Sequence, residues 1–284
     1  MPDALLLETP TLGEREFKHL AHLVENYSGI RMPPGKRTML EGRLRRRLRE
    51  RRMADFREYC RYLASDGGLD EELGDLIDVV TTNKTDFFRE PKHFEILTGS
   101  VLSTLTARGI GQRRPLHVWS AGSSIGAEAY TLAMVLAEYG LSCPGFDFRI
   151  LGTDLCTTVL EAAALAVYPE EMIEPVPLPL RRRYLMRSRE PKGKTVRVIP
   201  ELRAKAAFHR LNFMDAEYKS IGAQDIVFFR NVMIYFDNQT REAVLSRICA
   251  CIASGGYLFI GHSETISGFD LPLRQIAPTV YVRI

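Results

Sequence analysis

Small residues follow an apolar run in the stretch from Val118 to Gly126. The turn contains Gly122 and Gly126 and leads from a predicted strand into a predicted helix. Such a turn lets a ligand approach the backbone closely, at the edge of a sheet where doubly wound folds bind nucleosides. A tight strand–helix turn without a ligand is the alternative, because the stretch is one glycine short of a dinucleotide-binding fingerprint.

The next predicted strand ends in Asp154, directly after Leu151–Thr153. A carboxylate at a strand end can accept hydrogen bonds from both hydroxyls of a ribose, and a cap on the following helix is the alternative role. The sequence contains no P-loop motif, and its turn offers no grip for a pyrophosphate. A nucleoside cofactor without phosphates therefore fits better than NAD or ATP, and S-adenosylmethionine is such a cofactor.

Four sequence blocks resemble signatures of the chemotaxis receptor glutamate methyltransferases, the CheR type. The blocks occur in order, and the helical N-terminal region and an insert also have counterparts in that family. Four long blocks in sequence are far more specific than any single motif. They are Thr81–Glu90, Val118–Tyr130, Phe229–Asp237 and Gly261–Glu264.

The resemblance implies that S-adenosylmethionine binds, that S-adenosylhomocysteine is released, and that no metal takes part. Glu128 and Asp154 would hold the amino-acid and ribose parts, with the group that each contacts left open, and Tyr235 would face the reacting methyl group. The chain departs from the family pattern at Ala127 and near Cys156, where acidic residues are usual. The other residues implied at the cofactor are Asn83, Thr85, Arg89, Gly122, Asn212, Phe213, Arg230 and Asn231.

The reaction that the resemblance implies needs no general base. A glutamate carboxylate is already ionised at neutral pH, and its oxygen attacks the sulfonium methyl group in line. The protein must align and desolvate that carboxylate, which agrees with the lack of a His–Asp or Cys–His arrangement in the sequence. Arg89 is the best candidate to hold it, since a guanidinium pairs bidentately with a carboxylate, and Tyr235 is a second. A structural ion pair of Arg89 with Glu90 or with the acidic helix before it is the alternative.

Two regions of different pattern must position these residues. Apolar residues recur at helical intervals through residues 11–80, where Thr11 and Glu14 have capping-box spacing and Asp55 can cap a third helix. From residue 115, short apolar runs alternate with helices, which predicts a mostly parallel sheet. We therefore expect an α/β protein: a small all-helical domain (1–80), then a doubly wound, Rossmann-like class I methyltransferase domain (81–284). The expected strands are Leu116–Ser120, Phe148–Gly152, Phe208–Phe213, Asp225–Phe229, Tyr257–Gly261 and an antiparallel edge strand at Ala277–Ile284.

Residues 170–206 interrupt this alternation. They contain Pro175, Pro177 and Pro179, a run of three arginines, and a turn before the predicted strand Thr195–Ile199. We expect a helix and a β-ribbon, a β-subdomain insert that also has a family counterpart. In some family members the edge of this sheet captures a peptide at the receptor's C-terminus. Deleting residues 170–206 and measuring the affinity for receptor tail peptides tests whether this chain does so.

Residues 36–52 form a strongly basic predicted helix with an apolar stripe of three leucines. Nine Lys and Arg residues stand against two Glu, a net charge of +7 in a chain whose total is +3. A solvated face is the usual interpretation of such a run. Nucleic-acid binding is another, but no aromatic-interleaved basic surface recurs in the sequence. The resemblance favours a third, in which Arg43, Arg46 and Arg47 dock Glu-rich receptor helices.

The remaining sequence features indicate the cellular compartment and the partners of the protein. Five cysteines form no CxxC pair, and the first residues lack the basic and apolar regions of a signal peptide. The most apolar stretch, Ile226–Phe236, is too short to cross a bilayer. We expect a cytoplasmic monomer whose partners are chemoreceptor cytoplasmic domains, without nucleic acid and without membrane insertion.

The expected function is methyl transfer from S-adenosylmethionine to glutamate side chains of chemoreceptor (methyl-accepting chemotaxis protein) helices, giving glutamyl 5-O-methyl esters for chemotactic adaptation. Two other functions stay open. A nucleic-acid or protein N-methyltransferase would carry Asn-Pro-Pro-Tyr near Arg230–Tyr235, where this chain has neither proline. A non-catalytic adaptor would bind receptor tails and only sense the cofactor, which the presence of Arg89, Asp154 and Tyr235 disfavours.

Overall fold

The computed structural model describes residues 10–189 and 193–284. The chain divides between Thr82 and Asn83 into two compact units. No helix in the described ranges is long and apolar enough to cross a membrane. The first unit is helical, as predicted, and its elements are α1 (Glu14–Ser28), η1 (Pro34–Lys36), α2 (Arg37–Arg51), α3 (Phe56–Leu63) and α4 (Gly68–Val80).

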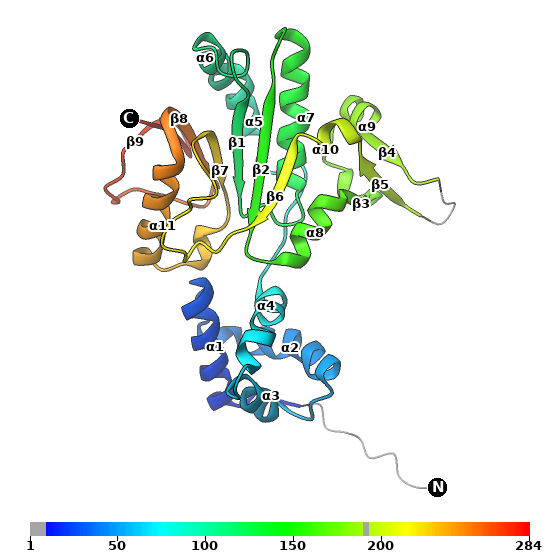
Figure 1. The fold of residues 1–284 in the computed structure, drawn as a ribbon, viewed down its shortest axis with the longest axis vertical. Coiled ribbons are helices and arrows are strands. Elements are labelled where there is room, and N and C mark those ends of the chain that lie inside the picture. Colours follow the sequence, from blue (N-terminus) through cyan, green and yellow to red (C-terminus); the bar gives the residue numbers. More distant parts are fainter. Residues whose placement is uncertain (1–9, 190–192) are drawn as a thin grey trace. The chain divides into compact units, whose positions relative to one another are not determined.

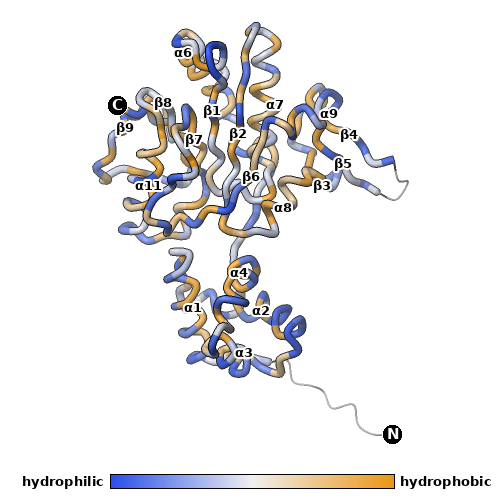
Figure 2. Tube along the Cα trace, in the orientation of Figure 1, coloured by the Kyte–Doolittle hydropathy of each residue, from blue (hydrophilic) through white to orange (hydrophobic). Residues whose placement is uncertain are grey.

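The core of the first unit follows the helical spacing of its leucines. Leu40, Leu44 and Leu48 are all buried on one side of α2, which confirms the predicted stripe. Asp55 caps α3, because its carboxylate accepts a hydrogen bond from the backbone N–H of Glu58 at 2.7 Å. The opposite, arginine-rich side of α2 gives this helix its strongly hydrophilic stretches (Figure 2).

The capping box predicted from Thr11 and Glu14 is wrong. The helix begins at Glu14 itself, so Glu14 occupies the first helical position and not the third, which a capping box requires. The preceding residue, Gly13, makes no side-chain cap. The chain before the helix is held instead by α2, since the backbone N–H of Leu12 donates to Glu41 Oε2 at 2.8 Å.

The second unit is built on a seven-stranded sheet of order β6-β2-β1-β7-β8-β10-β9 (Figure 1). Strands β6, β2, β1, β7 and β8 pair in parallel, and β10 pairs antiparallel with β8 and β9. The order runs outward in both directions from β1 and β7, which confirms the doubly wound class. The strands are β1 (Leu116–Ala121), β2 (Phe148–Asp154), β6 (Ala206–Arg210), β7 (Gln224–Phe229), β8 (Ile252–Ile260), β9 (Leu273–Ala277) and β10 (Val280–Arg283).

The crossover helices and the central strands form the core of this unit. Helices α7 (Ala127–Ser142) and α8 (Thr157–Leu165) follow β1 and β2, and α11 (Asn238–Cys251) follows β7. All six residues of β7 are buried, as expected for a parallel strand that is covered on both faces. Trp119 in β1 is fully buried and its indole N–H donates to Thr153 Oγ1 at 2.9 Å, which confirms its predicted place in the core.

The last expected strand is wrong in its position. The C-terminal segment forms a hairpin of β9 and β10, in which β10 lies inside the sheet beside β8 and β9 forms the edge. Because β10 pairs with both β8 and β9, Val280 at its start is buried. A short helical segment that the sequence analysis did not predict precedes β1: α5 (Lys92–Ile96), one π-helical turn (Leu97–Val101) and α6 (Leu102–Ala107).

The insert is a small antiparallel sheet of order β3-β5-β4, which confirms the predicted β-subdomain. Its central strand covers four of the five residues predicted for it. Two outer strands flank the central one, so both edges of this sheet lack a further strand among the described residues. Its elements are β3 (Val167–Pro169), η3 (Glu170–Ile173), α9 (Leu178–Tyr184), β4 (Leu185–Arg187), β5 (Thr195–Val198) and α10 (Pro200–Arg203).

Candidate cofactor and active site

The turn after β1 is shaped by its glycines. Gly122 has a φ of +82° and Gly126 a φ of +84°, both in the left-handed region that favours glycine. A Cβ atom on Gly122 would lie 2.6 Å from Val232 Cγ2, in the loop after β7. The turn therefore packs against that loop with no room for a side chain, at the end of the sheet where the strand order reverses.

Asp154 joins the end of β2 to this turn. Its Oδ2 accepts the backbone N–H of Ser124 at 2.8 Å, and its Oδ1 accepts that of Cys156 at 3.1 Å. Ser124 also donates from Oγ to the carbonyl oxygen of Asn83 at 2.8 Å. These hydrogen bonds hold the Asp154 carboxylate against the turn after β1.

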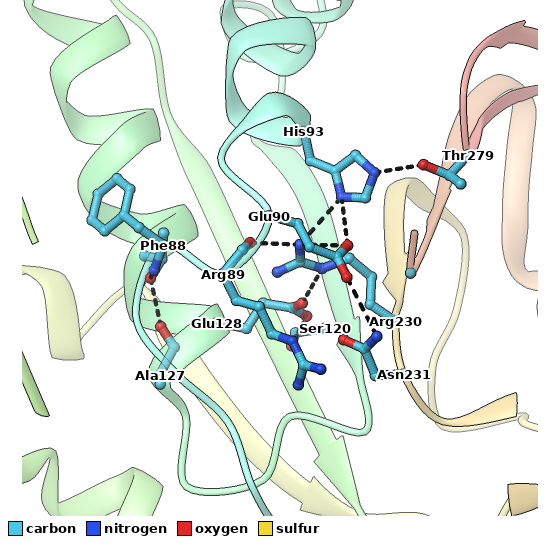
Figure 3. Close-up of polar contacts among 12 residues, drawn as sticks. Phe88, Arg89, Glu90, His93, Ser120, Ala127, Glu128, Arg230, Asn231 and Thr279 are labelled. Atoms are coloured by element: carbon cyan, nitrogen blue, oxygen red, sulfur yellow. Dashed lines mark hydrogen bonds and ion pairs between the residues drawn. The ribbon is translucent and has the colours of Figure 1, made fainter. Parts of the chain in front are cut away.

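Glu128 lies in the first turn of α7 and faces β1 and β7. Its Oε1 accepts from Ser120 Oγ at 2.6 Å, and its Oε2 accepts from Arg230 Nε at 2.6 Å. Its side chain is 12% exposed, so most of the carboxylate is turned into the protein. Figure 3 shows Glu128 between Ser120 and Arg230, which fixes its orientation.

The side chain of Arg230 lies inside a hydrogen-bond network. Only 2% of it is exposed, and besides Glu128 it contacts the carbonyl oxygen of Arg89 at 2.7 Å and His93 Nδ1 at 3.2 Å (Figure 3). Its Nη1 also lies 3.4 Å from Glu90 Oε2. The guanidinium predicted to line the pocket is thus directed at protein groups.

Arg89 projects from a backbone in an unusual conformation. Its neighbours Phe88 and Glu90 have φ values of +54° and +58°, which non-glycine residues rarely adopt. Within residues 10–189 and 193–284, no hydrogen bond or ion pair engages its guanidinium, which points away from the network in Figure 3. The alternative ion pair with Glu90 is not formed, since Glu90 Oε1 accepts from Asn231 Nδ2 at 3.3 Å.

Glu264 is a buried carboxylate to which the sequence analysis gave no role. It accepts backbone N–H groups of Asn231 at 2.9 Å, Met233 at 2.9 Å and Gly261 at 2.7 Å. It thereby ties the loop after β7 to the end of β8. Burial raises the pKa of Glu264 above 4.5, although the three N–H groups oppose that shift. The signal in the sequence was an acidic residue three positions after Gly261, the glycine that follows β8.

The remaining predicted residues lie around the same sheet end. Asn212 and Phe213 follow β6 and are buried, and Asn212 Oδ1 accepts the backbone N–H of Met214 at 3.0 Å. Tyr235 ends η4 (Met233–Tyr235) and is half-buried. Thr85 is half-buried in the segment that precedes α5.

The three arginines predicted to dock substrate have different surroundings on α2. Arg46 has a side chain that is 73% exposed and pairs with Glu50 at 2.6 Å. Arg43 donates to the carbonyl oxygen of Thr81 at 2.8 Å, near the end of α4. Arg47 is buried against Glu72. Of the three, only Arg46 presents most of its side chain to solvent.

Comparison with known proteins identifies the family. Residues 83–282 match the model described as the CheR methyltransferase SAM binding domain, and residues 15–81 match the CheR methyltransferase all-alpha domain. The chain belongs to the CheR methyltransferase family. This confirms the resemblance carried by the four sequence blocks.

Relatives of this CheR chain match it over nearly its whole length. It is 35% identical to Chemotaxis protein methyltransferase 2 of Pseudomonas aeruginosa, over 96% of this chain and 97% of that protein. It is 36% identical to the chemotaxis protein methyltransferase of Borreliella burgdorferi, over 94% and 93% of the two chains. The corresponding protein of Escherichia coli is 35% identical, over 97% and 93%. This CheR protein is therefore an S-adenosylmethionine-dependent protein-glutamate O-methyltransferase that methylates chemoreceptors.

The polar groups of this CheR site fit S-adenosylmethionine. Glu128 and Asp154 offer carboxylate oxygens that suit an ammonium group and a ribose. The turn from Ala121 to Ala127 carries no Lys or Arg, as suits a ligand without phosphates.

Among the described residues of this CheR protein, one cluster has metal-ligand chemistry. Ligand atoms of Glu90, His93 and His262 lie within 4.8 Å of one another. However, the Arg230 guanidinium lies 3.2 Å from His93 Nδ1, and His93 Nε2 is bonded to Thr279 Oγ1 at 2.8 Å. A cation at that distance repels a metal ion, so the cluster is explained by the hydrogen-bond network.

Proposed function

We propose that Arg89 binds the carboxylate of the glutamate that this CheR protein methylates. The observation that carries the proposal is the guanidinium of Arg89, which has no partner in the described residues although the acidic Glu90 is adjacent. A guanidinium offers two parallel N–H donors to a carboxylate. Arg89 would hold the substrate oxygen in line and replace the water that the carboxylate loses.

The cofactor would be held by residues from the ends of several strands. Glu128 and Asp154 would contact its amino-acid and ribose parts, and Asn212 with Phe213 would lie near the adenine. When bound, S-adenosylmethionine supplies the methyl group that becomes the glutamyl 5-O-methyl ester, leaving S-adenosylhomocysteine. The further contacts that we propose are Asn83, Thr85, Gly122 and Asn231, with Tyr235 facing the substrate.

We also propose that the exposed arginines of α2 dock the Glu-rich cytoplasmic helices of chemoreceptors, which places the enzyme in the cytoplasm. Charge complementarity of this kind raises association rates and is weakened by salt. The insert would capture a receptor tail peptide at a sheet edge. Its outer strands expose apolar side chains, Val167 in β3 and Met186 in β4, that suit an added strand.

The experiment is methyl transfer from labelled S-adenosylmethionine to receptor-containing membranes. Label released as methanol by mild base indicates carboxyl esters, whereas base-stable label would contradict the ester and indicate an N-methyltransferase. Arg89→Ala is expected to lower turnover by at least about 100-fold, since a charge-assisted pair is lost. Arg274→Ala, which removes an exposed arginine from β9, is the matched control. Turnover of Arg89→Ala equal to that of the control would remove Arg89 from the reaction.

A further inference from the structure

Arg230 joins two sides of the proposed active site. Its Nε donates to Glu128 on the cofactor side, and its Nη1 donates to the carbonyl oxygen of Arg89 on the substrate side. Its guanidinium lies 5.6 Å from the ring centroid of Phe94 and 5.4 Å from that of Phe228. Because these contacts confine the Arg230 side chain, its position fixes those of the Glu128 carboxylate and the Arg89 carbonyl oxygen.

The backbone at Arg89 requires such support. The left-handed conformations of Phe88 and Glu90 are unfavourable for residues with a Cβ, and surrounding contacts must hold them. The backbone N–H of Phe88 donates to Thr131 Oγ1 at 3.1 Å, and Arg230 binds the next carbonyl oxygen. These two hydrogen bonds fix the backbone from which the Arg89 side chain projects.

His93 in turn holds Arg230. His93 is fully buried, and burial, followed by the nearby Arg230 charge, lowers its pKa to about 4, so the ring is neutral at neutral pH. The hydroxyl of Thr279 donates to the carbonyl oxygen of Pro278 at 2.7 Å and therefore accepts from His93 Nε2. The proton of the neutral ring is on Nε2, and Nδ1 presents a lone pair to Arg230 Nη1 at 3.2 Å.

We propose that His93 and Arg230 are positioning residues for methyl transfer. Neutral His93 accepts a hydrogen bond from Arg230, and Arg230 thereby sets both the Arg89 backbone and the Glu128 carboxylate. Arg230 acts on methyl transfer through these two residues. The inference rests on the proposed roles of Arg89 with the substrate and of Glu128 with the cofactor.

The test compares two replacements of His93, each of which keeps one of the two hydrogen-bonding groups of the imidazole ring. Asn places its Oδ1 where Nδ1 lies and keeps an acceptor toward Arg230, whereas Gln places its amide N–H near Nε2 and keeps the donor toward Thr279. Both remove the buried ring, so a purely structural role would lower activity equally in both. The measurements are the dissociation constant of S-adenosylhomocysteine by calorimetry and kcat/KM on receptor membranes.

We expect His93→Gln to lose roughly 10- to 100-fold in both measurements, as for a lost hydrogen bond to a charged group, and His93→Asn to recover at least about tenfold of that loss. Thr279→Val should lose less than His93→Gln, since it leaves Nδ1 unchanged. Equal losses in the two His93 variants, or a loss in Thr279→Val that matches His93→Gln, would overturn the proposal.

Arg230→Lys keeps the test decisive if a His93 variant fails to fold. Lys retains the charge but cannot reach Glu128 and the Arg89 carbonyl oxygen together, so cofactor affinity and turnover should both fall. Unchanged values in a folded Arg230→Lys protein would also overturn the proposal. Failure of the proposed function is distinguishable, because it shows as unchanged turnover in Arg89→Ala whatever the His93 variants do.

Discussion

The guanidinium of Arg47 donates to both carboxylate oxygens of Glu72, with Nε and Nη2 each 2.8 Å from an oxygen. Glu72 is fully buried, so the pair lies in the interior of the helical unit. Burial opposes ionisation of Glu72, but the hydrogen bonds from Arg47 and Tyr59 outweigh it and hold its pKa below 4.5. Arg47 therefore stabilises the helical unit and adds little to the exposed basic surface of α2.

Replacing Arg47 should unfold the first unit more easily, while replacing Arg46 should not. Arg47→Ala removes the bidentate partner of the buried Glu72 carboxylate and leaves it with Arg51 and Tyr59, which costs about 1.5–3 kcal/mol in the free energy of unfolding. Arg46→Ala removes an exposed pair worth less than about 1 kcal/mol. Urea unfolding followed by circular dichroism measures both. Equal effects of the two replacements would show that the buried pair is not what stabilises the unit.

Receptor docking should depend on the exposed arginines of α2. Arg46→Ala combined with Arg49→Ala is expected to raise KM for receptor membranes and to reduce its salt dependence, because two exposed charges are lost. The affinity for S-adenosylhomocysteine should stay unchanged. The matched control is Arg57→Ala with Arg61→Ala, which removes two exposed arginines from α3. Similar KM values in the two double variants would show that docking does not select α2.

Asp154→Asn should weaken cofactor binding. An amide nitrogen replaces one acceptor oxygen and faces either Ser124 N–H or Cys156 N–H, so the turn loses a hydrogen bond and the ribose an acceptor. We expect the dissociation constant of S-adenosylhomocysteine to rise roughly 10- to 100-fold, measured by calorimetry. Asp147→Asn, just before the other end of β2, is the control and should leave that constant unchanged. A rise of similar size in the control would contradict a local role for Asp154.

His93 should make the second unit sensitive to mild acid. Burial and then the Arg230 charge lower its pKa to about 4, against 6.5 for an ordinary histidine, so the unfolded chain binds a proton more readily. This contribution to stability is complete above pH 6.5 and is lost as the pH falls toward 4. The loss amounts to about 3 kcal/mol in the free energy of unfolding.

The fluorescence of Trp119, the single tryptophan of the chain, follows unfolding of this unit at each pH. His93→Asn should flatten the dependence in that range, because it removes the titrating ring. Glu72 and Glu90 do not obscure the result, since their pKa values lie below 4.5 and their stabilisation is lost at lower pH. An unchanged slope in His93→Asn would assign the acid sensitivity to another group.

Local sequence patterns were sufficient to predict most of the fold. The stripe of Leu40, Leu44 and Leu48 and the cap at Asp55 depend on residues a few positions apart, and both are confirmed. The alternation of apolar runs and helices likewise predicted the parallel sheet. The antiparallel strand β10 was predicted, but β9 and its place at the edge were missed, because strand order depends on which strands pair and not on the pattern within one strand.

The partners of charged residues could not be read from the sequence. Arg46 and Arg47 are adjacent in one basic run, yet one is exposed and the other pairs with Glu72, 25 positions along the chain. Arg230 was expected at the cofactor, and its partner Glu128 lies 102 positions away. Such pairs form only when the helices and strands pack together. Residue type and spacing can therefore locate the site, but they cannot predict which partner each arginine binds.

The close approach of Gly122 to Val232 limits which amino acids evolution can place at position 122. A side chain at Gly122 is opposed twice, by the 2.6 Å contact with Val232 and by the left-handed backbone of Gly122 itself. A smaller residue at position 232 relieves the contact but not the backbone. A second substitution at position 232 alone therefore cannot make a larger residue at position 122 acceptable. We expect glycine to be retained at this position as the enzyme evolves.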